Sequence, residues 1–424
     1  MSNAEAMEAT AAGGPPPAFS RLRWAVIGFA FLATVLNYID RQTLSVLAPT
    51  LRQECGITDA QYGLIISAFL GAYTVSNGIS GAFVDRVGTK IGYAVFVLWW
   101  SVSSMLHAFA RGPWSLGTFR LLLGVGEAGN WPAAVKIVSE WFPPQERTLA
   151  AGLFNSGAAI GAVVAAPLVA FLALHGGWRS AFVLTGSLGF LWLAGWWRLY
   201  RAPEPAAAPA RPPPVPIRRL VRTRFVAVFT LSKIFMDPIW YFYIFWIPKY
   251  LASVFHFTLA DIGRTAWIPF ATADAGNLLG GLVTGWMIRH GVPVALARKG
   301  SAVMFGLLMT AAIPAIFAGT SAQAIAWISI ATLGYTGYTA NTLAFPAEVF
   351  PPEAVGSIWG LASMGAGFGG MVFASLSGWM IERHGYVPVF IGYGLLPLVG
   401  LTLIGVGLGR LDRDPRFGAA AAAR

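Results

Sequence analysis

Glu140-Trp141-Phe142-Pro143-Pro144 recurs 208 residues later as Glu348-Val349-Phe350-Pro351-Pro352. At the same offset, five glycines of the first half fall on five glycines of the second: Gly126, Gly129, Gly152, Gly157 and Gly161 on Gly334, Gly337, Gly360, Gly365 and Gly369. An ungapped agreement of this kind indicates a tandem repeat of two related halves in the same orientation. Parallel six-span repeats are a transporter architecture whose substrate site lies near the midplane between the halves.

The composition around this repeat is that of a membrane protein. Of 424 residues, 56% are hydrophobic and 11% are charged, whereas a soluble domain carries about 25% charged residues. This composition excludes an ordinary soluble enzyme and a globally disordered chain. The one cysteine, Cys55, and five scattered histidines give no disulfide scaffold and no metal site. We therefore expect no metal and no other cofactor.

Twelve apolar runs are long enough to cross a bilayer. They begin near Trp24, Tyr62, Ile91, Trp114, Leu149, Trp178, Phe225, Thr265, Ser301, Ala324, Val355 and Val387. With both termini in the cytoplasm, 19 of the 29 Lys and Arg fall in cytoplasmic segments and six in outer loops, as the positive-inside rule requires. The sequence predicts a multi-pass protein of the inner or plasma membrane. Its net charge of +11 reflects this topology, and we expect no binding of nucleic acid.

Proline divides the chain between the sixth and seventh spans. Seven of the fourteen residues 203–216 are proline, a composition that favours extended chain over a packed unit. We therefore predict an all-α membrane protein with five segments. These are a disordered cytoplasmic tail at 1–20, a six-helix bundle at 21–200, a cytoplasmic linker at 201–224, a second six-helix bundle at 225–410 and a cytoplasmic tail at 411–424.

Ionisable side chains inside a span are costly, so each needs a partner or a function. In the first span, polar residues recur every three or four positions and predict a stripe that faces a water-filled cavity. The stripe consists of Thr34, Asn37, Tyr38, Arg41 and Ser45, with Asp40 beside it. In the fourth span, Arg120, Glu127 and Trp131 share one face. We predict that these faces line one chamber.

The second half supplies fewer polar residues at membrane depth. Lys233, Asp237, Trp240 and Tyr241 share a face of the seventh span, and Pro238 interrupts the backbone hydrogen bonds there. The eighth and tenth spans add Asp274 and Asn341. A buried structural pair is the alternative for each charged residue, for example Asp40 with Lys136 or Lys233 with Asp237.

Two arginines that face one cavity suit a ligand carboxylate, because guanidinium binds it through two hydrogen bonds and stays charged. Aromatic residues offer flat faces and hydroxyls for a sugar-like ligand, although such residues also pack against lipid. These are Tyr38, Tyr73, Trp131, Trp240 and Tyr241. Burial of Asp40 and Glu127 favours the neutral acids, whereas a neighbouring arginine favours the carboxylates. We hypothesise symport, in which a bound anion occupies the arginines and lets an acid take up a proton.

The loop between the second and third spans resembles a motif of the major facilitator superfamily. Gly81-Ala82-Phe83-Val84-Asp85-Arg86-Val87-Gly88-Thr89-Lys90 carries both glycines, the Asp-Arg pair and the basic end of that motif. The resemblance implies twelve transmembrane helices and alternating access. It also implies that Asp85, Arg86 and Lys90 are gating residues of the cytoplasmic side.

Within that superfamily, four stretches resemble the anion:cation symporter family. They are Asn37 to Arg41, Gly124 to Ala134, Glu140 to Pro143 and Phe154 to Gly157. Lys233, Asp237 to Trp240 and Phe245 to Tyr250 are similar to its hexuronate transporter branch. The resemblance implies proton-coupled uptake of galacturonate or glucuronate. Arg41 and Arg120 would bind the carboxylate and Asp40 and Glu127 would carry protons, with Asn155 and Ser156 as polar contacts.

Several points stay open in this interpretation. Related carriers take galactonate, glucarate or aromatic acids, and Asp237 and Asp274 are further candidates for proton coupling. A membrane-embedded enzyme lacks support, because no span carries metal-ligand spacing or a nucleophile near a histidine. A sugar-acid sensor without transport would share the same cavity. We expect a monomer in the bilayer whose ligands are a small organic anion and H⁺.

Overall fold

The computed structural model describes residues 17–143, 146–201, 216–408 and residue 411. Most of the predicted tails at 1–20 and 411–424 and of the predicted linker at 201–224 lies outside these residues. Where the boundaries can be compared, two differ. The first helix begins at Pro17, because proline suits the first helical position, so the predicted tail ends earlier. The linker also contains a short helix.

The described part of the first half is helical, without a β-strand. Its elements are α2 (Pro17–Val46), α3 (Ala48–Cys55), α4 (Asp59–Val87), α5 (Thr89–Leu106), η1 (His107–Phe109), α6 (Pro113–Glu127), α7 (Asn130–Trp141) and α8 (Arg147–Leu199). α8 is two spans joined at Gly177, whose φ of 78° turns the chain without a loop.

The described part of the second half is also helical. Its elements are α9 (Ile217–Leu220), α10 (Arg224–Phe255), α11 (Leu259–Thr265), α12 (Ile268–Arg289), α13 (Val294–Leu308), η2 (Met309–Ala311), α14 (Ala312–Ile316), α15 (Ser321–Thr342), α16 (Phe345–Val349), α17 (Pro352–His384), α18 (Val387–Thr402) and the π-helical turn η3 (Leu403–Gly407). Eight helices of the described chain are long and apolar enough to cross a membrane. With α8 counted as two spans and the more polar α6–α7, α12 and α15 added, the prediction of twelve spans is confirmed.

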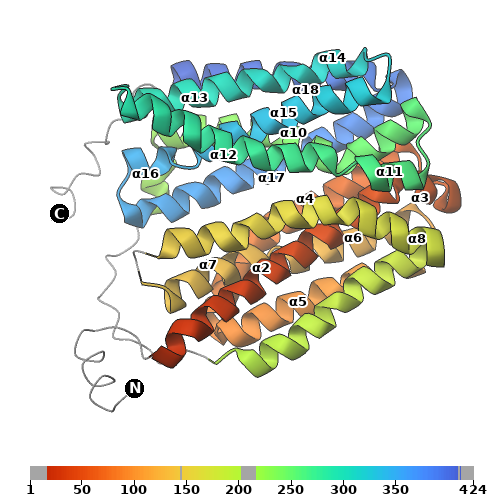
Figure 1. Ribbon diagram of the computed structural model, residues 1–424, viewed down its shortest axis with the longest axis horizontal. Coiled ribbons are helices and arrows are strands. Elements are labelled where there is room, and N and C mark those ends of the chain that lie inside the picture. Colours follow the sequence, from red (N-terminus) through yellow and green to blue (C-terminus); the bar gives the residue numbers. More distant parts are fainter. Residues whose placement is uncertain (1–16, 144–145, 202–215, 409–410, 412–424) are drawn as a thin grey trace.

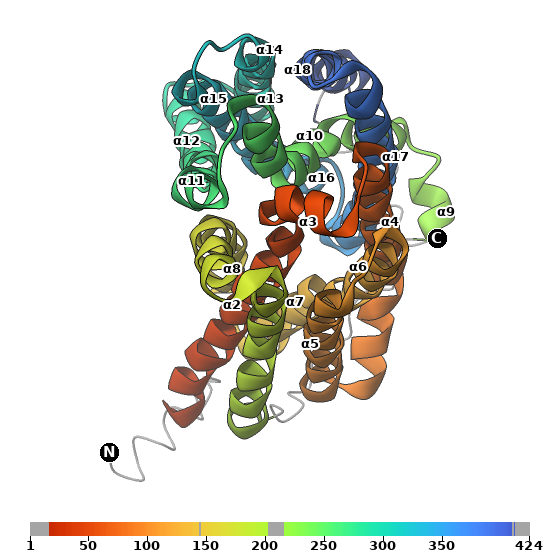
Figure 2. The same cartoon turned by 90° about the vertical axis from the view of Figure 1, so that its right-hand side faces the viewer.

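The two halves lie against each other along their length (Figure 1), with the red to yellow-green half below and the green to blue half above. Seen along the helices (Figure 2), α4 meets α17 and α8 meets α11 at the boundary. The two halves therefore contact each other through at least two pairs of helices.

The repeated glycines make equivalent contacts in the two halves. A methyl group on Gly157 of α8 would stand 2.6 Å from the Phe31 carbonyl oxygen of α2, and one on Gly365 of α17 would stand 3.0 Å from the Thr230 carbonyl oxygen of α10. Gly152 and Gly360, which also correspond, both face open space. The duplication read from the sequence is thus a duplication of helix packing.

The repeated glutamates, Glu140 and Glu348, lie near the ends of equivalent spans. Glu140, near the end of α7, accepts a hydrogen bond from Thr89 at the start of α5 (2.8 Å). Glu348 of α16 pairs with Arg298 of α13 (3.1 Å). In each half, this glutamate ties the end of one span to the start of the preceding one.

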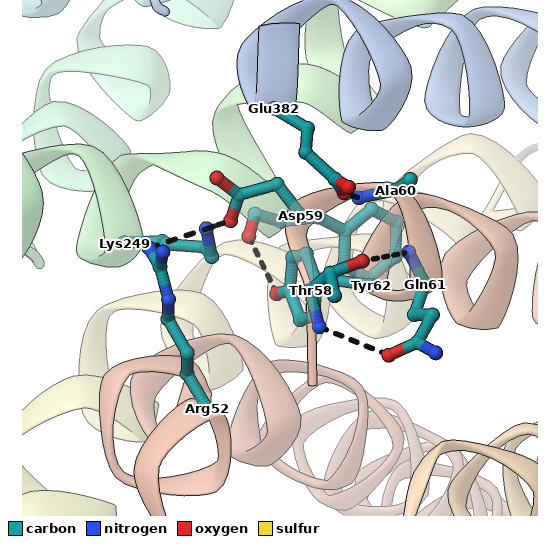
Figure 3. A network of polar contacts seen from close by, with 9 residues as sticks. Arg52, Thr58, Asp59, Ala60, Gln61, Tyr62, Lys249 and Glu382 are labelled. Atoms are coloured by element: carbon teal, nitrogen blue, oxygen red, sulfur yellow. Dashed lines mark hydrogen bonds and ion pairs between the residues drawn. The ribbon is translucent and has the colours of Figure 1, made fainter. Parts of the chain in front are cut away.

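Polar contacts between the halves gather at the end of the bundle that the predicted orientation places outside the cell (Figure 3). The Nζ of Lys249 on α10 pairs with the carboxylate of Asp59 on α4, and Arg52 lies 3.6 Å from the same carboxylate. Glu382 of α17 accepts a hydrogen bond from the Ala60 amide (2.7 Å). We call Asp59, Lys249, Ala60 and Glu382 the outer network.

Three hydroxyl groups extend the outer network toward the middle of the bundle. They join Ser45 to the Ile244 carbonyl, Tyr62 to the Phe245 carbonyl and Ser67 to the Met371 carbonyl, each at 2.7 Å. At the opposite end, the ion pairs of the described residues stay within one half, as in Arg23–Glu146 and Lys136–Asp85. The structure is thus closed at the predicted outer end.

Candidate functional site

Arg41 of α2 and Glu127 of α6 form a buried ion pair. The Nε and Nη2 of Arg41 lie 2.9 and 2.8 Å from the same Glu127 oxygen, Oε2. Their side chains are 5% and 0% exposed, and Asn37 accepts a further hydrogen bond from Arg41 at 3.3 Å. The other oxygen, Oε1 of Glu127, has no hydrogen-bond partner among the described residues. One position for a proton or a donor is therefore left on this acid.

Aromatic rings enclose the Arg41 guanidinium. Its central carbon lies 5.0 Å from the ring centres of Tyr38 and Tyr73 and 5.2 Å from that of Phe69. Rings at this distance attract a cation through their negative faces. Arg41 is thus a buried cation that is surrounded by aromatic rings and paired with one carboxylate.

Arg120 of α6 lies against the backbone of α2 at Arg41. It is fully buried, and its guanidinium donates to the Arg41 backbone carbonyl and to that of Asp40 (3.4 Å). Phe69 and Phe245, one from each half, lie 5.0 and 6.0 Å from it. Arg120 therefore binds the backbone that carries Arg41.

Asp40 is hydrogen-bonded to α5. Its Oδ1 accepts a hydrogen bond from Ser104 of α5 at 2.8 Å, and the residue is buried. The suggested alternative pair of Asp40 with Lys136 is wrong, because Lys136 pairs with Asp85 at 2.9 Å. Lys136 lies at the end of α4 that carries Asp85, where it also donates a hydrogen bond to the Val84 carbonyl (3.0 Å).

The second half holds its own ion pair on α10. Lys233 and Asp237, one turn apart, lie 3.2 Å from each other, as the alternative interpretation of these residues suggests. The Nζ of Lys233 lies 5.5 Å from the ring centre of Trp359 and 5.9 Å from that of Tyr338.

Trp240 and Tyr335 form a stacked aromatic pair. Their ring centres are 5.3 Å apart and their planes are within 7° of parallel. Tyr335 was not predicted from the sequence as a site residue. It corresponds to Glu127 at the repeat offset of 208 residues. Tyr241 packs against Phe245 (6.5 Å) and lies over Gly370 of α17, where a methyl group would meet its ring at 2.6 Å.

The remaining predicted binding residues are spread over α7, α8, α12 and α15. Trp131 is half-buried against Phe154 (5.4 Å), whereas Asn155 and Ser156 are exposed. Asp274 is half-buried and has no hydrogen-bond or ion-pair partner in the described part of the chain. It follows Phe270 by one turn, and Phe270 contacts Trp240. Asp274 thus shares the face of α12 that Phe270 turns toward α10.

Asn341 lies inside the packing of the second half. Its amide nitrogen donates to Ser301 (3.0 Å), the Gly337 carbonyl (2.9 Å) and the Gly280 carbonyl (3.3 Å). Its amide oxygen accepts from Thr284. These contacts join α12, α13 and α15, and both polar atoms of the Asn341 side chain have partners within this packing.

The motif at 81–90 turns the chain from α4 into α5. Gly88 sits at the turn with a φ of 84°, which explains the second glycine of the motif. Asp85 is 73% exposed and contacts Lys136, Arg86 is exposed, and the Nζ of Lys90 lies 5.1 Å from the Trp197 ring centre. All three predicted gating residues therefore lie at one end of the bundle.

Comparisons with known proteins agree with this architecture. The sequence model of the Major Facilitator Superfamily matches residues 30–339. A hexuronate transporter of Escherichia coli (strain K12) is 32% identical over 402 residues, which cover 90% of this chain and 93% of that protein. A galacturonate transporter of Dickeya chrysanthemi is 33% identical over 278 residues, 61% of this chain and 81% of that protein.

Solved structures share the fold at low sequence identity. A bacterial homolog of the human lysosomal transporter Spinster, in an inward-facing and unoccupied conformation, is 21% identical with a TM-score of 0.72 and covers 93% of both chains. A D-xylose-proton symporter is 11% identical with a TM-score of 0.76, covering 92% of this chain and 98% of that one. Because the superfamily model matches most of the chain and a relative 32% identical spans 90% of it, the chain belongs to the Major Facilitator Superfamily.

Proposed function

We propose that this protein imports sugar acids together with protons by alternating access, with hexuronates such as galacturonate and glucuronate as substrates. As a member of this superfamily it is a transporter and not an enzyme. The relatives named above are a hexuronate and a galacturonate transporter, and a D-galactonate transporter of Escherichia coli is 27% identical. In this proposal a single chain suffices, because the repeat supplies both sides of the chamber.

The buried pair of Arg41 and Glu127 carries the proposal. A buried cation without a carboxylate partner is strongly destabilised. Arg41 can therefore release Glu127 only when a substrate carboxylate pairs with Arg41 instead. Glu127, then without its cation, takes up a proton, because a buried unpaired carboxylate is unfavourable. Anion and proton thus enter together, and the net charge of the pair and its ligands stays the same.

The aromatic residues supply the rest of the proposed site. The stacked Trp240 and Tyr335 offer a flat surface for a sugar ring, and the hydroxyls of Tyr38, Tyr73 and Tyr241 can hydrogen-bond to its hydroxyl groups. Trp131, Asn155 and Ser156 are proposed as further contacts.

Two further acids remain proposed proton carriers. Asp40 is next to Arg41 in the chain, and Arg120 binds its carbonyl. Asp274 is half-buried on the face of α12 that bears Phe270. Asp85, Arg86 and Lys90 are proposed to hold the cytoplasmic side closed in the opposite state of the cycle.

Replacement of Glu127 by Gln tests the coupling. In proteoliposomes with an imposed pH gradient, Glu127→Gln should abolish accumulation of labelled galacturonate while exchange of internal for external substrate continues. Glu54→Gln, at an exposed acid on α3, is the matched control and should accumulate substrate normally. Accumulation by Glu127→Gln would contradict the proposed proton carrier.

The same assay separates the substrate and function classes. Competition by glucuronate, galactonate, glucarate and phthalate ranks the hexuronates against other organic anions. Binding of galacturonate without exchange would identify a sensor instead of a transporter.

A further inference from the structure

In the described part of the chain, each half has one cation–carboxylate pair whose cation is buried among that half's own helices. The first half has Arg41 with Glu127, and the second has Lys233 with Asp237. The second pair lies within one helix turn of α10, so helix packing alone does not require it. Such a pair costs desolvation energy without a clear gain in stability, which makes a role in ligand binding worth testing.

The surroundings of the second pair resemble those of the first. Rings from two other helices face the cation, namely Tyr338 of α15 and Trp359 of α17. As with Arg41, an aromatic environment leaves one carboxylate as the main partner of the cation.

Tyr241 connects the two pairs. It follows Asp237 by one turn of α10, and its ring stacks on that of Phe245, with 6.5 Å between the ring centres. Phe245, one turn further along α10, packs near Arg120 of the first half (6.0 Å). The face of α10 that begins at Lys233 therefore runs toward the Arg41 pair.

The exposure of the second pair indicates which member a ligand would meet. The Asp237 side chain is 16% exposed and the Lys233 side chain 3%, so the carboxylate covers the cation. A ligand carboxylate would reach Lys233 by displacing Asp237. A hexuronate has one carboxylate and can replace one acid, whereas a hexarate, with a carboxylate at each end of a six-carbon chain, can replace both.

We infer that Lys233 is a second carboxylate site, which extends the substrate class to hexarates, and that Asp237 takes up a second proton when this site is filled. The inference rests on the proposed function. Charge then balances in both cases: one carboxylate enters with one proton on Glu127, and two carboxylates enter with two protons, on Glu127 and Asp237. Each proton comes from the outer side and leaves to the cytoplasm after the substrate.

The first experiment compares galactarate with galacturonate, which differ by one carboxylate. Lys233→Gln should raise the ratio of the KM for galactarate to that for galacturonate by roughly tenfold to a hundredfold, as expected for one lost charge-assisted hydrogen bond. Lys233→Arg keeps the charge and should keep the ratio near that of the wild type. Lys299→Gln, at a half-buried lysine of α13, is the control for loss of a lysine elsewhere in the second half.

Loss of one member of a buried pair can also impair folding. The double variant Lys233→Gln/Asp237→Asn removes both charges and leaves no unpaired ion, so it tests the same ratio in a folded protein. An unchanged ratio in this variant would overturn the inference, because the pair would then be structural.

The second experiment counts protons from the pH gradient at which net substrate flux into proteoliposomes reverses, with the substrate gradient held fixed. Wild-type protein should take up one proton with galacturonate and two with galactarate, and Asp237→Asn should reduce the second number to one. Uptake of galactarate by that variant would then carry net negative charge inward. An unchanged proton count would also contradict the inference.

The outcomes separate this inference from the proposed function. If wild-type protein takes up galacturonate and neither transports nor binds galactarate, the second site is wrong and the proposed function stands. If it takes up neither compound with a proton gradient, the proposed function itself fails.

Discussion

Arg41 is held by contacts of three kinds at once: an ion pair with Glu127, a hydrogen bond to Asn37 and the faces of three aromatic rings. A planar guanidinium can satisfy all of them, because its nitrogens point outward in one plane and its faces remain free. A lysine ammonium is a point charge without such a plane. These contacts together fit the shape of arginine and not merely its positive charge.

Replacement of Arg41 by Lys tests this requirement. We expect the KM for galacturonate to rise about tenfold or more, because at least one charge-assisted hydrogen bond and the stacking are lost. Initial uptake rates over a range of galacturonate concentrations measure this. Arg111→Lys, at an exposed arginine before α6, is the control. A KM close to the wild-type value would show that charge alone is enough.

Asn341 leads to the opposite expectation at the same scale. Its amide joins three helices of the second half. Asn341→Ala should therefore lower the free energy of unfolding by about 1–3 kcal/mol, because buried polar partners lose their hydrogen bonds. Its effect on the KM should be smaller than that of Arg41→Lys. Thermal unfolding in detergent, with Ser187→Ala at a half-buried serine as control, measures the first part. A large rise in KM without loss of stability would return Asn341 to the binding site.

The sequence predicts the place of these residues better than their partners. Spacing on α6 places Arg120 and Glu127 on one face, and spacing on α2 places Arg41 in a polar stripe, because helix periodicity determines which side chains share a face. That Arg120 binds backbone carbonyls depends on how closely α6 approaches α2, which a pattern does not encode. Tyr335 was missed because it is not charged, although its position in the repeat could have found it.

At the scale of helices, the crossing of α4 and α17 is a contact between two backbones. A methyl group on Gly63 would stand 2.6 Å from the Ala374 carbonyl oxygen and 3.0 Å from the Cα of Gly378. A backbone atom cannot move aside as a flexible side chain can. This crossing joins the two halves next to the outer network, so its closeness sets how far the outer end can close.

Gly378→Ala should therefore hold the outer end partly open. Its methyl group would stand 2.5 Å from the Asp59 carbonyl oxygen. We expect lower uptake of galacturonate. We also expect an impermeant maleimide applied outside to label a Ser67→Cys reporter faster, because Ser67 is a buried residue that contacts α17. The background is Cys55→Ala, because Cys55 is the only cysteine of the chain.

Gly360→Ala is the matched control on the same helix, because a methyl group there meets nothing within 4 Å. It should label and transport as the background does. Equal effects of the two substitutions would show that α17 is sensitive to any added methyl group and that the crossing has no special role.

Glycine spacing predicts some of these contacts and not others. The pair Gly276 and Gly280, four residues apart on α12, packs closely on α15, whereas the equally spaced Gly281 and Gly285 face open space. Both pairs look alike in the sequence. Which face of a helix meets a neighbour depends on the rotation of the whole helix, and that is set by the sum of its contacts.

For the whole molecule, we expect the outer network to influence the balance between the state with a closed outer end and the state with an open one. Asp59 and Lys249 belong to different halves and must separate when the outer end opens. Asp59→Asn leaves Lys249 buried without its carboxylate, which costs about 3–5 kcal/mol for a buried pair. The closed outer end is therefore destabilised relative to the open one.

We expect the Asp59→Asn variant to label faster at the same Ser67→Cys reporter, by about tenfold for each 1.4 kcal/mol. The double variant Asp59→Asn/Lys249→Gln should show a smaller increase, because no unpaired charge remains. Glu54→Gln is the control for loss of an exposed outer acid. Unchanged labelling of Asp59→Asn would show that hydroxyl contacts and glycine packing close this end alone.

The sequence predicts the twelve spans and the duplication, because both depend on patterns within the chain. The outer network could not be predicted in the same way. Its members come from α4, α10 and α17, and only the packing of these helices, which lie far apart in the sequence, brings their side chains together. The sequence does show that Arg52 and Lys249 lie in outer segments, which is the part that topology determines.

The closed outer end also has a pharmacological consequence. A charged inhibitor that cannot cross the bilayer would find the chamber blocked when added to the medium, and would act only on molecules that turn over. The same compound delivered to the cytoplasmic face would meet a resting transporter that is already receptive. Inhibition should therefore be sided, and a screen with intact cells alone would overlook compounds that bind well from within.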